Sequence, residues 1–138
     1  MGQTRLAILR QQIDDWRVRQ HFNRVETILR AQDVRHLSYS LQVARERCLN
    51  WLHDYAACGV FPRNHECPGC SPCFIDRDGR ECAVAHLMMR SGYAETAYKV
   101  ASAANYASVS QINIAELDSW GMQVGLSREE LTLIQPGY

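Results

Sequence analysis

The stretch from His65 to His86 holds the side chains best suited to chemistry. It contains four of the six cysteines and two of the five histidines of this 138-residue chain. In Cys67-Pro-Gly-Cys70, two thiolates share one turn, so their sulfur atoms can face a common centre, as a tetrahedral zinc ion requires. Cys82 and His86 lie four residues apart, which places them on one face if a helix begins near residue 80.

The sequence therefore predicts a zinc site. The expected ligands are Cys67, Cys70, Cys82 and His86, with Cys73 and His65 available as extra ligands. The spacing C-x2-C-x11-C-x3-H over residues 67–86 resembles that of treble-clef and Cys3His zinc fingers. This resemblance implies a structural ion, because four protein ligands leave no open position for a water molecule. The function it implies is a small zinc-binding module with a role in binding or assembly.

Disulfide bonds are a second interpretation, because an even number of cysteines also fits an exported protein stapled by disulfides. Cys48 and Cys58 fall on one predicted helix, about 15 Å apart at a rise of about 1.5 Å per residue. A disulfide needs Cα atoms within roughly 7 Å, so these two cannot bond each other. Cys58 can reach the loop over residues 67–73, and Cys48 is expected to be a buried thiol.

Two further alternatives use the same cysteines. Cys67, Cys70, Cys73 and Cys82 resemble the four thiolate ligands of a four-iron iron–sulfur cluster. In the other alternative, Cys82 near a helix start, His86 one turn later and Asp76 in the preceding loop form a Cys-His-Asp thiol active site, hydrolytic, transferring or redox. The sequence leaves zinc, disulfides, an iron–sulfur cluster and thiol catalysis open.

The elements around this stretch are predicted to be helical. Helices are expected over about 4–31, 39–58, 80–91, 94–105 and 113–120, with a last helix starting at a capping box, Ser127 to Glu130. Ser38 or Ser40 is the expected N-cap of the second helix, and Gly59 its stop. The predicted fold class is all-α, in a single domain over 1–138. It comprises a helical hairpin over 1–62, a Cys/His-rich knuckle, small hairpin and helix over 63–92, and short helices over 93–138.

The first predicted helix carries two apolar stripes. The first stripe is Leu6, Leu9, Ile13 and Trp16, and the second, shifted around the helix, is Val18, Phe22, Val25 and Leu29. Residues 1–47 hold nine arginines against five acids, and residues 91–138 hold two basic residues against five acids. The arginine-rich helix could serve a protein partner, a homo-oligomer or an anionic partner.

Bulk composition narrows the function classes. The formal net charge is zero and the pI near 6.9, which argues against a general nucleic-acid binder. The sequence contains no run of about 18 apolar residues, so no membrane-spanning helix is predicted. The N-terminal residues lack the apolar core of a signal peptide, so a cytoplasmic location is expected for the chain as it stands. If a native signal peptide precedes it, the expected location is periplasmic or secreted.

Several strings in the second half resemble an uncharacterised family of small, often exported bacterial proteins. They are Gly59-Val-Phe-Pro, Phe74-Ile-Asp, Cys82-Ala-Val-Ala-His86-Leu and Ile134-Gln-Pro-Gly-Tyr138. The resemblance covers about the last 80 residues and implies export, but no particular activity. It includes Asp76, Cys82 and His86, whereas Cys67, Cys70 and Cys73 are not part of the family's strings.

Overall fold

The computed structural model describes residues 4–63 and 71–138, and this part of the chain is helical with no extended strand. Its helices are α1 (Arg5–Arg30), α2 (Tyr39–Cys58), α3 (Ala83–Arg90), α4 (Ala94–Ala104), the 3-10 helix η1 (Val109–Gln111), α5 (Ala115–Val124) and α6 (Arg128–Ile134). The predicted all-α class is confirmed. The predicted Cys-rich knuckle is not, because Cys67, Cys70 and His65 lie outside the described residues.

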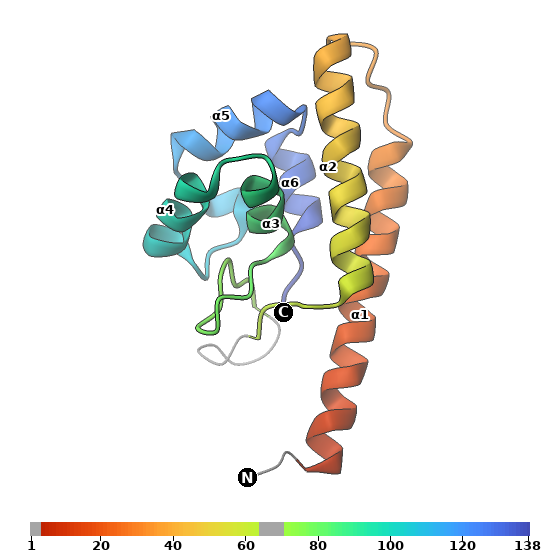
Figure 1. Ribbon diagram of the computed structural model, residues 1–138, viewed down its shortest axis with the longest axis vertical. Coiled ribbons are helices and arrows are strands. Elements are labelled where there is room, and N and C mark those ends of the chain that lie inside the picture. The colour runs from red at the N-terminus through yellow and green to blue at the C-terminus, as the bar shows by residue number, and fades with distance from the viewer. Residues whose placement is uncertain (1–3, 64–70) are drawn as a thin grey trace.

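Helices α1 and α2 form the predicted antiparallel hairpin, joined by residues 31–38 at one end of the molecule (Figure 1). The hydroxyl of Ser38 accepts a hydrogen bond from the Leu41 amide and so caps α2. At the other end of α2, Gly59 has φ of 71°, a left-handed conformation that favours glycine. The sequence signals at both ends of this helix are therefore confirmed.

The core lies where α3 packs between α2, α4 and α6. Five consecutive or near-consecutive residues of α3 are fully buried, namely Ala83, Val84, Ala85, Leu87 and Met88. The second stripe of α1 faces this core, with Val18, Phe22, Val25 and Leu29 all buried. Trp120 of α5 is also fully buried in this core, and its indole N–H donates to the Ser91 hydroxyl at 2.8 Å. The core thus takes side chains from all six α-helices.

The segment before α3 turns tightly around a buried carboxylate. A single antiparallel bridge between Ile75 and Glu81 takes the place of the predicted small hairpin. Asp76 lies inside this turn, and its carboxylate accepts a charged hydrogen bond from Arg80 Nε at 2.8 Å. The same carboxylate accepts backbone N–H groups of Arg63, Asp78 and Arg80. These bonds fix the turn that delivers the chain into α3.

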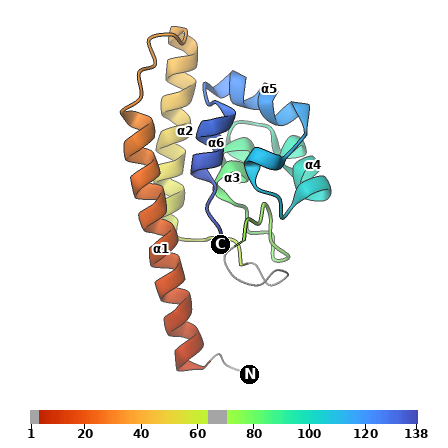
Figure 2. The same cartoon turned by 180° about the vertical axis from the view of Figure 1, so that it is seen from behind.

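The first turns of α1 project beyond the rest of the described structure (Figures 1 and 2). Between described residues, the hydrogen bonds from α1 to other segments that lie nearest its N-terminus are made by Arg17, whose Nη2 donates to the Gly137 carbonyl, and by Arg19, whose Nε donates to the Ala56 carbonyl. Residues 5–10 are all exposed. Among the described helices, none combines the length and apolar character needed to cross a bilayer.

Candidate functional site

Cys82, one of the four predicted zinc ligands, is completely buried at the start of α3. The helix begins at Ala83, later than the predicted residue 80, so Cys82 is its N-cap. The thiol turns toward the first turn of the helix and accepts from the Ala85 amide at 3.4 Å. Burial raises the pKa of the Cys82 thiol to about 12, so at neutral pH it is protonated and unreactive.

His86 has a different set of partners. Its Nδ1 lies 3.0 Å from Glu81 Oε1, and its ring lies against Tyr55, with 5.0 Å between the ring centroids. The Tyr55 hydroxyl donates to the Glu81 carbonyl. These groups form one wall of a cavity of about 460 Å³, which Trp51 also lines. The imidazole therefore packs among α2 and the segment before α3.

The predicted metal-binding function is wrong for the part of the chain that the structure describes. Within residues 4–63 and 71–138, no three His, Cys, Asp or Glu side chains lie together in a group that could hold a metal ion. The physical reason is that Cys82 serves as a helix cap, whereas His86 is held by Glu81 and Tyr55. Cys73 is buried, with its sulfur 3.9 Å from Asn105 Nδ2. Cys67, Cys70 and His65, on which the zinc and iron–sulfur hypotheses also depended, lie outside the described residues.

The two hypotheses without a metal fare no better. Thiol catalysis needs a thiolate at Cys82, but this thiol is neutral, and the Asp76 carboxylate is committed to the turn around it. The disulfide hypothesis allowed Cys58 to pair with the loop that follows, but Cys58 is a free, exposed thiol. Cys48 is a free, buried thiol, as predicted. Among the described residues, Cys82 and Asp76 therefore have structural roles, as a helix cap and as the acceptor at the centre of a turn.

A different surface stands out on α1. Four large apolar side chains, which we call the apolar row, are between 52% and 61% exposed: Leu6, Leu9, Ile13 and Trp16. A contiguous set of exposed apolar side chains of this size is typical of an interaction site. Their spacing of three, four and three residues is that of the a and d positions of a coiled coil.

The apolar row faces away from the core. At about 100° per residue, its centre lies about 170° around α1 from the centre of the buried stripe formed by Val18, Phe22, Val25 and Leu29. An extension of α2 along α1 would therefore cover the opposite face. Ile8, which is 45% exposed, lies about 120° from the row on the same helix, at about 100° per residue. The row can be buried only by a surface that approaches from outside this hairpin.

Arginines flank the apolar row on both sides. In the heptad register that the row defines, the e positions are Arg10 and Arg17, and the g positions are Arg5, Gln12 and Arg19. The two acids of this segment, Asp14 and Asp15, lie on the half of the helix turned toward the core stripe. No acidic residue occurs in the first turn. The row is therefore an apolar strip with a cationic border.

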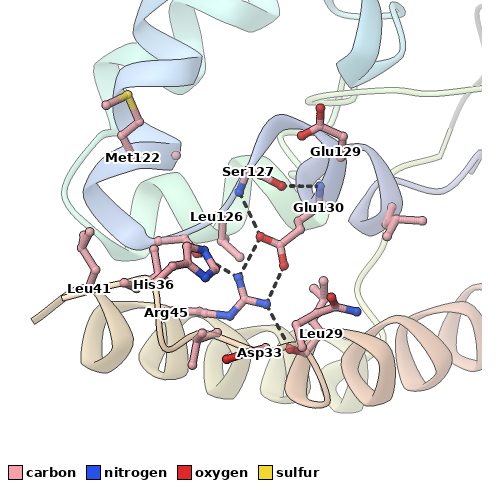
Figure 3. A pocket seen from close by; sticks show the side chains of 16 residues that line it. Leu29, Asp33, His36, Leu41, Arg45, Met122, Leu126, Ser127, Glu129 and Glu130 are labelled. Carbon is pink, nitrogen blue, oxygen red and sulfur yellow. Dashed lines mark hydrogen bonds and ion pairs between the residues drawn. The ribbon is translucent and has the colours of Figure 1, made fainter. Parts of the chain in front are cut away.

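A second unfilled surface lies near the opposite end of the hairpin, between residues 31–38 and the junction of α5 with α6 (Figure 3). This cleft, which we call the α5–α6 cleft, has a volume of about 650 Å³. Its apolar lining comprises Leu29, Val34, Leu37, Leu41, Met122, Leu126 and Leu133. Met122 is 75% exposed, and Leu133 is also exposed. The cleft is within the usual size range of ligand pockets, about 300–1,000 Å³.

A buried ion pair forms the polar wall of the cleft (Figure 3). Arg45 Nη1 donates to Glu130 Oε1 at 2.8 Å and to the Gly125 carbonyl at 2.9 Å, and Nη2 donates to the Leu29 carbonyl at 3.0 Å. Burial acts to raise the pKa of Glu130, but the hydrogen bonds from Arg45 and the Ser127 amide outweigh it and lower the pKa. Both terminal nitrogens of the guanidinium thus donate to protein acceptors.

The remaining charge around the cleft is negative. The cleft residues Asp33, Glu129 and Glu130 are acidic, and the basic side chains among the described lining residues are Arg45 and His36. Glu130 is neutralised by Arg45, and Asp33 is paired with the exposed Arg35. Glu129 is exposed at the rim. The α5–α6 cleft therefore combines an apolar lining with one carboxylate at its rim, that of Glu129, whose charge is opposite to that of the arginines beside the apolar row.

Sequence reasoning missed Arg45, although one signal was present. Arg45 lies at i+4 from Leu41 and three residues before Cys48, so it falls within the apolar face predicted for α2. A charged residue in that position indicates a buried ion pair. Its partner, Glu130, was recognised only as the last residue of a capping box, which the structure confirms.

Comparison of the chain with protein-family models, with curated proteins and with solved structures finds no match.

Proposed function

We propose that this protein is an interaction module that docks an acidic, partly apolar surface of a partner onto the apolar row of α1. The observation that carries the proposal is that Leu6, Leu9, Ile13 and Trp16 are more than half exposed and point away from the core. Full burial of a large apolar side chain stabilises by about 1.5–3 kcal/mol. Burial of the exposed half of four such side chains would therefore contribute several kcal/mol to binding.

The charges beside the row select the kind of partner. In a parallel pair of two α1 helices, Arg5 of one copy would face Arg10 of the other across the g–e′ position. In an antiparallel pair, e positions face e positions, so Arg10 would lie opposite an arginine again. Like charges placed in this way disfavour both homodimers of α1. A surface with carboxylates beside an apolar strip matches the row in both respects.

The test uses a synthetic heptad peptide with leucine at a and d and glutamate at e and g. We expect this labelled peptide to bind the full chain, as fluorescence anisotropy would measure, and to bind less tightly as salt is raised. Its lysine counterpart should not bind. The double variant Leu9→Glu with Ile13→Glu should lose binding at least tenfold, and because both sites are exposed, its fold should be retained.

The matched control is Ile8→Glu, which changes another exposed isoleucine outside the row on the same helix. This variant should bind the acidic peptide as the wild type does. Equal binding of the glutamate and lysine peptides would contradict the charge argument. Equal loss in Ile8→Glu and in the row variant would show that the row is not the docking surface.

A further inference from the structure

We propose that the acidic apolar surface bound by the apolar row is the α5–α6 cleft of a second copy, so that the chain assembles head to tail. This inference rests on the proposed docking role of α1. The occupant is a second copy, because the same chain carries both an arginine-bordered apolar strip and an apolar cleft with the exposed carboxylate of Glu129 at its rim. Both are open in the described part of the molecule.

Chemical complementarity is the first argument. The row presents leucine, isoleucine and tryptophan, and the cleft is lined mainly by leucines with Met122, an unbranched side chain that adapts to irregular surfaces. Arg5 and Arg10 at the border of the row are exposed, as is Glu129 at the rim of the cleft. A row seated in the cleft would bring these opposite charges to the edge of the interface, where they set orientation.

Position in the fold is the second argument. The projecting turns of α1 and the connection over residues 31–38, which lines the cleft, lie at opposite ends of the molecule (Figures 1 and 2). Because α1 is a continuous helix, the row cannot fold back into the cleft of its own chain. A contact between two different surfaces on successive copies is heterologous. It leaves a free row at one end of the assembly and a free cleft at the other, so further copies can add. Such an assembly grows into open chains or closes into rings.

The experiment exploits this asymmetry with two variants and sedimentation velocity. The row variant is Leu9→Glu with Ile13→Glu, and the cleft variant is Met122→Lys with Leu133→Lys; all four positions are exposed. The wild type should grow in mass with concentration beyond a dimer. Each variant alone should remain at the mass of one chain, 15.8 kDa. Circular dichroism of each variant checks that the helical fold is retained.

A mixture of the two variants gives the decisive reading. The intact row of the cleft variant should enter the intact cleft of the row variant. No further copy can then add, because the row and the cleft that remain free are the mutated ones. The mixture should therefore reach close to twice 15.8 kDa and no more. The Ile8→Glu control should assemble as the wild type does.

Other outcomes overturn the inference. Assembly of the cleft variant alone, with none in the row variant, would show that the row pairs with a surface other than the cleft. A wild type that stays monomeric at every concentration would also overturn it, including the case in which the row binds vesicles of anionic lipid instead. Binding of the acidic heptad peptide by such a monomer would leave the proposed docking role of α1 standing, so the two failures are distinguishable.

Discussion

Replacement of Glu130 by glutamine should destabilise the protein strongly, because the change leaves Arg45 buried without its counter-ion. The side chain of Arg45 is 5% exposed and that of Glu130 is 18% exposed. Removal of one member of a buried ion pair costs about 3–5 kcal/mol, and the partial exposure of Glu130 places the expected loss near the lower end. For a chain of this length, about 3 kcal/mol corresponds to a fall in Tm of roughly 10 °C.

Urea unfolding followed by circular dichroism at neutral pH would measure this loss, with Arg45→Met and the double variant completing a thermodynamic cycle. Arg45→Met should also destabilise, because the carbonyls of Leu29 and Gly125 lose their donor. The free energy of unfolding lost in the double variant should be smaller than the sum of the two single losses, by about 1 kcal/mol or more. Strict additivity, or a Glu130→Gln variant as stable as the wild type, would refute the ion-pair argument.

The same pair predicts a pH dependence. The pKa of Glu130 is lowered in the folded protein from its ordinary value of 4.5, which it has in the unfolded chain. At pH values above 4.5, the ionised carboxylate therefore contributes its full stabilisation to the folded state. This contribution is lost as the pH falls through the lower pKa of the folded state. The stability difference between wild type and Glu130→Gln should therefore be constant near neutral pH and shrink below about pH 4.5. A difference that grows on acidification would contradict the assignment.

Three further predictions concern the segment around α3. Asp76→Asn should lower the free energy of unfolding by about 2 kcal/mol, because the turn loses its charged acceptor; an unchanged urea midpoint would contradict this. Tyr138→Phe should cost about 1–3 kcal/mol by the same measurement, because the buried Ala83 amide loses the phenol oxygen that accepts from it. In native protein, a thiol reagent should modify Cys58 rapidly and Cys82 only after unfolding, as residue-resolved mass spectrometry would detect; fast labelling of Cys82 would refute its burial.

Both ends of α2 and the start of α6 were predictable because their signals are local, whereas α5, expected over 113–120, spans Ala115–Val124. Ser38, Gly59 and the pair Ser127 and Glu130 each satisfy backbone groups within a few residues of themselves. The core stripe of α1 was also visible as periodicity, and Phe22 is buried as its pattern indicated. Signals of this kind do not depend on how distant segments pack, so the sequence is sufficient for them.

The site was less predictable because it depends on orientation and on contacts far apart in the chain. Cys82 and His86 have ligand spacing, but a start of α3 at Ala83 turns the thiol into a cap. The two stripes of α1 are equally apolar in the sequence, and the side of α1 on which α2 and α6 pack decides which stripe is buried. Likewise, Arg45 and Glu130 meet across 85 positions, which no local pattern encodes.

Hydroxyl-radical footprinting of α1, read by mass spectrometry with and without the acidic heptad peptide, tests the docking role of the apolar row most directly. Trp16 and Ile13 should become several-fold less oxidised when the peptide is present, whereas Ile8 on another side of the same helix should be oxidised as before. Equal protection of Ile8 and Ile13, or no protection of either, would contradict the account.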